Sequence, residues 1–128
     1  MMSTYITLGS NDSEKSNVFY DAVLATIDWK SHLDFPGWRA YSEQGKGENF
    51  TLWIAQPFNQ QAATAGNGTM VGFSASTHAE VDAFYAAAMA NGGSDDGAPG
   101  LRPHYGPHWY AAYMRDPTGN KIAIVCNQ

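Results

Sequence analysis

The sequence contains an internal repeat, and this repeat limits the folds that the chain can adopt. Residues 5–25 align with residues 70–90 without a gap. The copies share a Phe-Tyr dipeptide and two alanines in register, which are Phe19-Tyr20, Ala22 and Ala25 in the first copy and Phe84-Tyr85, Ala87 and Ala90 in the second. One shared dipeptide can arise by chance, but a pattern of this length indicates two copies of one supersecondary unit. We therefore expect two similar modules in one chain.

Each copy is predicted to begin with a strand and to continue as a helix. Residues 5–9 and 70–75 form short alternating or apolar runs that suit strands. Side chains that can cap a helix follow in both copies, namely Asn11 or Asp12 and then Ser76 or Thr77. Further strands are expected over residues 27–33, 38–43, 50–55, 109–114 and 121–126, with a turn at residues 116–120. This order predicts an α+β fold of two βαβββ modules.

The polar, glycine-rich sequence between the copies indicates how the domain is organised. Residues 1–128 are expected to form a single domain. Module one covers about residues 4–56, a linker covers residues 57–69, and module two covers about residues 70–126. A second loop, over residues 94–107, is long for a compact domain, and loops of that length are often functional.

Composition and charge exclude several classes of partner. Hydrophobic residues make up 44% of the chain and charged residues 15%, which is typical of a folded protein. The net charge is −5 and no basic run occurs, so nucleic acids and anionic membranes are poor partners. No apolar stretch approaches the roughly 20 residues that span a bilayer, and no signal peptide is apparent at the start. We expect a cytoplasmic protein whose single cysteine, Cys126, is a buried hydrophobic residue.

The chain resembles the vicinal oxygen chelate superfamily, which includes glyoxalases, bleomycin resistance proteins and extradiol dioxygenases. Three features carry the resemblance: the paired modules, the Phe-Tyr dipeptide in each helix and the closing segment DPTGNKIAIV. The resemblance extends from Thr4 to Cys126. It implies two modules whose curled mixed sheets surround a central cleft, with the helices outside. It also implies a homodimer, and enzymes of the family hold a divalent metal in the cleft.

The positions that carry metal ligands in this family hold other residues here. The first-strand positions are Tyr5 and Met70, and the last-strand position of module two is Ala123. In module one the last-strand position is Trp53, or Thr51 if the register differs by two. None of these residues is His, Asp or Glu, and the usual divalent metals need several oxygen or imidazole donors. We therefore expect no metal and no other cofactor.

Strand alternation assigns the remaining positions to two faces. One set is expected to pack under the helices: Ile6, Leu8, Val71, Phe73, Ile122, Ile124 and Cys126. The other set is expected to line the cleft: Tyr5, Thr7, Thr51, Trp53, Met70, Gly72 and Ala123. An apolar cleft with aromatic walls is typical of a small-molecule site.

The segment 101–110 contains two candidate catalytic residues, His104 and His108. In the functional interpretation this loop covers the cleft, with Tyr105 at its mouth and one histidine acting as a proton donor or orienting group. In the structural interpretation the imidazoles are bonded to backbone carbonyls. A metal site built on this pair would need further donors such as His32, Asp34 or Asp95. On its own, His32 has no support as a ligand.

Three functions follow from these observations. The leading hypothesis is a metal-independent protein that binds and sequesters a small, partly aromatic ligand, with Tyr5, Trp53 and Met70 as walls. The alternative is an enzyme, either a metal-dependent lyase, isomerase or dioxygenase of the same superfamily or a metal-independent enzyme using His104 or His108 as acid or base. The third is a structural or regulatory dimer, which predicts a cleft filled by Trp53 and Met70.

Overall fold

The computed structural model describes residues 4–128 and has the predicted α+β fold. The first module contains β1 (Thr4–Gly9), α1 (Ser13–Ala25), β2 (Trp29–Phe35), β3 (Trp38–Glu43) and β4 (Phe50–Ala55). The second contains β5 (Met70–Ser74), α2 (His78–Ala90), β6 (Ser94–Asp95), β7 (Gly100–Leu101), β8 (Trp109–Arg115) and β9 (Lys121–Asn127). The long loop of module two thus contains two short strands that the sequence did not reveal.

The two modules have equivalent sheets. The first sheet has the strand order β1-β4-β3-β2, and the second has the order β5-β9-β8-β6 with β7 also paired to β8. The first strand of each module runs parallel to the last, while the other pairs are antiparallel. The sequence repeat therefore corresponds to a structural repeat, as predicted.

Local sequence determines where each helix begins and ends. The Asp12 carboxylate accepts a 3.1 Å hydrogen bond from the backbone N–H of Lys15, and Thr77 accepts an equivalent bond from Glu80. These two residues are therefore the N-caps among the alternatives that the sequence offered. The second helix ends where Gly92 adopts a φ of 97°, a conformation that glycine enters at little cost.

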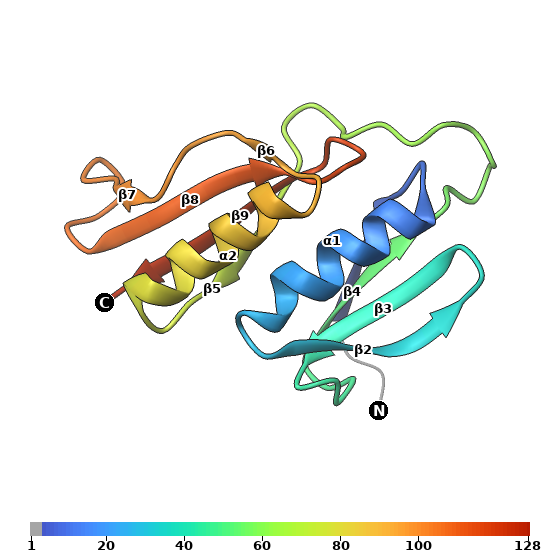
Figure 1. The fold of residues 1–128 in the computed structure, drawn as a ribbon, viewed down its shortest axis with the longest axis horizontal. Helices are drawn as coiled ribbons and strands as arrows, with labels where there is room; N and C mark the ends of the chain where they lie inside the picture. Colours follow the sequence, from blue (N-terminus) through green and yellow to red (C-terminus); the bar gives the residue numbers. More distant parts are fainter. Residues whose placement is uncertain (1–3) are drawn as a thin grey trace.

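One continuous core joins the modules. Helices α1 and α2 lie next to each other on one side of the two sheets (Figure 1). Six of the seven positions that were predicted to face the helices are buried: Leu8, Val71, Phe73, Ile122, Ile124 and Cys126. The seventh, Ile6, is partly buried against the core. The β-strand alternation therefore predicted the core face of the sheets correctly.

Hydrogen bonds also connect module one to the β8–β9 turn. The hydroxyl of Tyr20 donates to the Asp116 carboxylate at 2.6 Å, and the amide of Asn120 donates to the backbone oxygen of Gly9 at 2.8 Å. The turn itself has the predicted form, with Gly119 at a φ of 104° and its N–H bonded to the Asp116 oxygen. Within residues 4–128 the two sheets do not close on one another. The faces that the helices leave free are therefore open.

Candidate ligand-binding site

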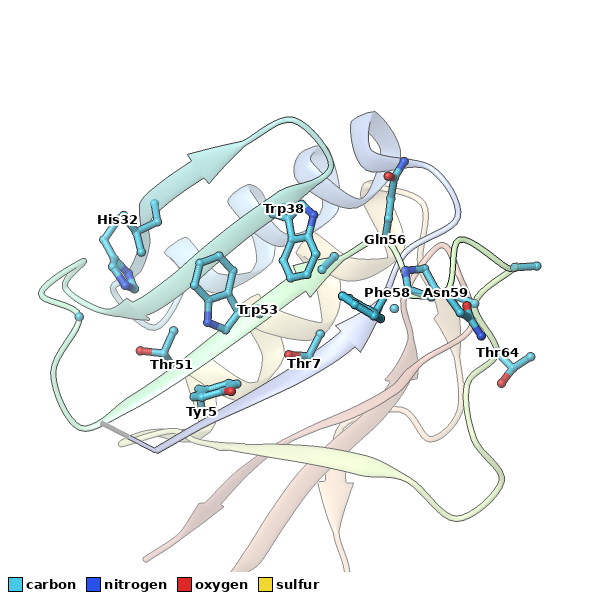
Figure 2. Close-up of a pocket in the computed structure, with 17 residues that line it drawn as sticks. Tyr5, Thr7, His32, Trp38, Thr51, Trp53, Gln56, Phe58, Asn59 and Thr64 are labelled. Atoms are coloured by element: carbon cyan, nitrogen blue, oxygen red, sulfur yellow. The ribbon is translucent and has the colours of Figure 1, made fainter. Parts of the chain in front are cut away.

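The open face of the first sheet carries a cavity of about 940 Å³. Its floor is formed by β1 and β4, which are paired so that Tyr5 lies opposite Thr51 and Thr7 opposite Trp53. All four side chains line the cavity (Figure 2). Because alternate residues of a strand share a face, these positions point away from the helices. The structure thus brings together four of the predicted ligand-binding residues.

Aromatic side chains form one end of this cavity. The rings of Trp38 and Trp53 meet edge to face, with centroids 6.2 Å apart and an interplanar angle of 79°. Phe58 follows in the segment after β4 and is 95% exposed, although it lines the cavity. Small residues, Gly9 and Ala55, lie between them on the floor. The arrangement offers flat apolar surfaces against which a ring can pack.

The linker supplies a wall of the cavity, which the sequence did not indicate. Residues 56–64, which are the last residue of module one and the start of the linker, include seven of the lining residues: Gln56, Pro57, Phe58, Asn59, Ala62, Ala63 and Thr64. Asn11 holds this segment in place: its Oδ1 accepts from the N–H of Ala63 at 2.7 Å and its Nδ2 donates to the oxygen of Ala63 at 3.1 Å. A Cβ atom on Gly9 would lie 2.7 Å from the Cβ of Ala63, so the linker packs directly on β1.

The other end of the cavity is polar and contains His32. The imidazole Nδ1 lies 2.9 Å from the hydroxyl of Ser42, and that hydroxyl accepts a 2.7 Å bond from the backbone N–H of Gly47. Partial burial lowers the pKa of His32 below its usual 6.5. The sequence named His32 only as a further donor for a metal site and gave it no support as a ligand on its own. The strand that carries it has an irregularity between Ser31 and Leu33, so simple alternation does not assign its face.

Three other predicted residues lie at the second sheet. Met70 and Ala123 line a cavity of about 360 Å³ together with Trp109 and Tyr113. Tyr105 and Met70 line another, of about 790 Å³. Neither cavity shares a lining residue with the one on the first sheet. The chain therefore does not assemble Tyr5, Trp53 and Met70 in one cavity.

His104 and His108 lie on the exposed loop between β7 and β8. The ring of His104 is 4.2 Å from that of Tyr105, centroid to centroid. Neither histidine lines any of the three cavities described above. A catalytic role for either residue stays a prediction.

The residues at the family's metal positions do not fit a divalent ion. These positions offer no carboxylate and no imidazole, because they hold Tyr5, Met70, Ala123 and either Trp53 or Thr51. Across residues 4–128, no three His, Cys, Asp or Glu side chains are grouped so that they could hold a metal. Asp34 is instead paired with Arg39, and Asp95 accepts from the hydroxyl of Tyr85.

None of the helices within residues 4–128 is long and apolar enough to cross a membrane.

Solved structures identify the fold. A glyoxalase/bleomycin resistance protein from Albidiferax ferrireducens is 37% identical, with a TM-score of 0.86 and 98% of both chains covered. A glyoxalase-related enzyme from Fulvimarina pelagi is 25% identical, with a TM-score of 0.77, over 99% of this chain and 88% of that one. A glyoxalase/bleomycin resistance protein/dioxygenase family enzyme from Burkholderia phytofirmans shares the fold at 20% identity, with a TM-score of 0.76 and full coverage of both chains.

No family model matches the sequence, and no curated protein matches it. The resemblance inferred from the repeat is nevertheless confirmed by the structural neighbours, since the similarity to the Albidiferax protein extends over nearly the whole of both chains. The chain belongs to the glyoxalase/bleomycin resistance protein family of the vicinal oxygen chelate superfamily.

Proposed function

We propose that this protein binds a small, partly aromatic molecule in the cavity of the first sheet, without a metal ion, and thereby sequesters it. The observation that carries the proposal is that Tyr5, Thr7, Thr51 and Trp53 line one cavity, next to Trp38 and Phe58. Its volume of about 940 Å³ lies in the range of sites for small molecules, which is roughly 300–1,000 Å³. Burial of apolar area and stacking on the indoles supply the affinity.

The competing functions have less support. The family's metal chemistry would need donors that the ligand-equivalent positions do not provide. An acid–base mechanism at His104 or His108 would need a substrate beside an exposed loop rather than in one of the cavities. A structural dimer with a filled cleft does not account for the open volume beside Trp53.

We further propose that the protein is a cytoplasmic homodimer and that each chain acts as a single domain. Tyr5 and Met70, which are equivalent in the repeat, are 55% and 47% exposed on the open faces of the two sheets. A two-fold axis would let the second sheet of one copy cover the first sheet of the other, and the reverse, so both faces would be buried at once. Sedimentation at micromolar concentration should show a dimer; a monomer would contradict this part of the proposal.

Ligand titration tests the function directly. Binding of bicyclic aromatic compounds should quench the tryptophan fluorescence in a saturable manner. Trp53→Ala should weaken that binding by more than about 1 kcal/mol, which is about fivefold in the dissociation constant, because an aromatic wall of the cavity is lost. Val18→Ala is the matched control, since Val18 is exposed on α1 and lies outside the cavity. Equal dissociation constants for the parent protein and Trp53→Ala would exclude this cavity as the ligand-binding site.

A further inference from the structure

The cavity floor is divided into a polar end and an aromatic end. Strand register places Thr51 opposite Tyr5, and both line the cavity. On the other side of Thr51 lies Ser42, which is fully buried and does not line the cavity, so a row of hydroxyl-bearing side chains crosses the sheet. The next row on the same face contains Ala40, Trp53 and Thr7. His32 extends the polar row at the edge strand, where it lies on the cavity side with Trp53 and Thr51 (Figure 2). A ligand that covers Trp53 therefore has one end beside these polar groups.

The hydrogen bonds around Ser42 favour one tautomer of His32. Ser42 is fully buried, and its oxygen already accepts from the N–H of Gly47 at 2.7 Å. If Nδ1 of His32 carried the proton, the hydroxyl would accept twice and its own hydrogen would have no partner among residues 4–128. Burying an unpaired hydroxyl costs free energy, which favours the arrangement in which the hydroxyl donates to Nδ1 and the imidazole proton is on Nε2. Partial burial of the ring also lowers its pKa, which favours the neutral form.

Gly47 leaves the Nε2 edge of this ring uncovered. A Cβ atom at this position would lie 3.2 Å from Cδ2 and 3.3 Å from Nε2 of His32. Any residue other than glycine at position 47 would thus place its side chain against the Nε2–H of His32. Gly47 also has a φ of 70°, which side chains rarely adopt. Both residues line the cavity, so the edge of the imidazole next to Gly47 lies at the cavity wall.

We propose that the Nε2–H of His32 is a specificity-determining hydrogen-bond donor, and that the ligand is an aromatic compound carrying a carbonyl oxygen at one end. The ring system packs on Trp53 and Trp38, and the oxygen accepts from His32. Ser42 is a positioning residue, because it acts through the tautomer of the imidazole and not by contact with the ligand. This inference rests on the proposed function, since it assigns the ligand class of the same cavity.

Matched pairs of compounds test the assignment. Each pair is an aryl methyl ketone and its ethyl analogue, which has nearly the same shape without the acceptor, on phenyl, naphthyl and indolyl rings. Dissociation constants come from tryptophan fluorescence. The parent protein should bind the ketone of a pair about 3- to 10-fold more tightly, which is the usual range for one net hydrogen bond. His32→Ala should remove this preference and leave the affinity for the ethyl compound almost unchanged.

Two further variants distinguish recognition from loss of structure. His32→Gln should recover part of the preference, because the glutamine amide places an N–H close to the position of Nε2. His78→Ala is the control, since His78 is stacked on Tyr110 of module two at a centroid distance of 4.0 Å and does not line the cavity. Nitrogen-15 spectra of the histidines should show His32 as the Nε2–H tautomer, assigned by its absence in His32→Gln. In Ser42→Ala this signal should shift towards a mixture of tautomers.

The outcomes separate this inference from the function on which it rests. If both members of each pair bind equally, and Trp53→Ala weakens both, the cavity binds aromatic molecules but the role of His32 is overturned. If the ketone preference persists in His32→Ala, the donor is another group and the assignment is likewise wrong. If no compound of any pair shows saturable binding, the proposed function fails and the ligand class fails with it.

Discussion

The hydroxyl of Tyr20 on α1 donates a 2.6 Å hydrogen bond to Oδ2 of Asp116, a residue 96 positions later in the chain. Asp116 is buried and accepts four further bonds, from the backbone N–H groups of Thr118, Gly119 and Asn120 and from the Asn120 amide. A buried carboxylate is tolerated when its oxygens are satisfied in this way. The contact therefore connects the two modules through a buried polar group.

Removal of the Tyr20 hydroxyl should destabilise the protein. Tyr20→Phe leaves the ring in place but deprives the Asp116 carboxylate of one donor, so the free energy of unfolding should fall by about 1–3 kcal/mol in urea titrations. Tyr85→Phe is the matched control, because Tyr85 is the repeat equivalent and its hydroxyl contacts the exposed Asp95. Its free energy of unfolding should change by less than about 0.5 kcal/mol. Equal losses in the two variants would contradict the importance of the buried contact.

Alkaline pH should weaken the fold through the same residue. Burial, and then the charge of Asp116, raise the pKa of Tyr20 well above its usual value of 10.0. Below pH 10 the phenol is protonated in both states, so its contribution to stability is fully present. Above pH 10 the unfolded chain loses this proton while the folded chain keeps it, so the free energy of unfolding should fall as pH rises. Urea titrations between pH 9 and about 11 should show a shallower fall in Tyr20→Phe.

The linker wall should be sensitive to one methyl group on β1. In Gly9→Ala the new Cβ would lie 2.7 Å from the Cβ of Ala63, so the linker must move away from the strand. Aromatic ligands should then bind several-fold more weakly, as measured by fluorescence titration. The double variant Gly9→Ala/Ala63→Gly removes the opposing methyl group and should restore most of the affinity. No recovery in the double variant would mean that Gly9 acts in another way.

Chelators should leave both stability and binding unchanged. The ligand-equivalent residues Tyr5, Trp53, Met70 and Ala123 do not provide a donor set for a divalent ion. Elemental mass spectrometry of untagged protein, purified without chelator, should find no near-stoichiometric metal, and EDTA should not change the melting temperature. A stoichiometric metal whose removal lowers the melting temperature would contradict metal-free binding and direct attention to His104 and His108.

The internal repeat made most of the fold predictable. Both helices and the main strands follow from local patterns, and alternation placed Leu8 and Ile122 on the core side. The floor of the cavity was predictable for the same reason, because Tyr5, Thr51 and Trp53 occupy the opposite face. These are properties of single strands, which sequence periodicity reports directly.

The remaining parts of the site depend on tertiary structure. His32 had no support as a ligand from the sequence alone, and the irregularity in β2 means that simple alternation does not assign its face. Phe58 lies in a segment without periodic structure, so its place in the cavity wall follows only from how the linker packs. Met70 and Ala123 line a separate cavity on the second sheet, and the relative position of the two sheets depends on how the modules pack, for example at the contact of α1 with α2. That packing is not encoded in the alternation of any strand.

The wall built from residues 56–64 has a consequence for how ligand preference can evolve in this fold. The segment contributes side chains to the cavity but none to the buried core cluster, so substitutions in it escape most of the selection that acts on folding. Phe58 and Asn59 can therefore vary between related chains at small cost in stability while the floor on β1 and β4 persists. Homologues that accept different molecules should accordingly differ most in this short stretch of chain.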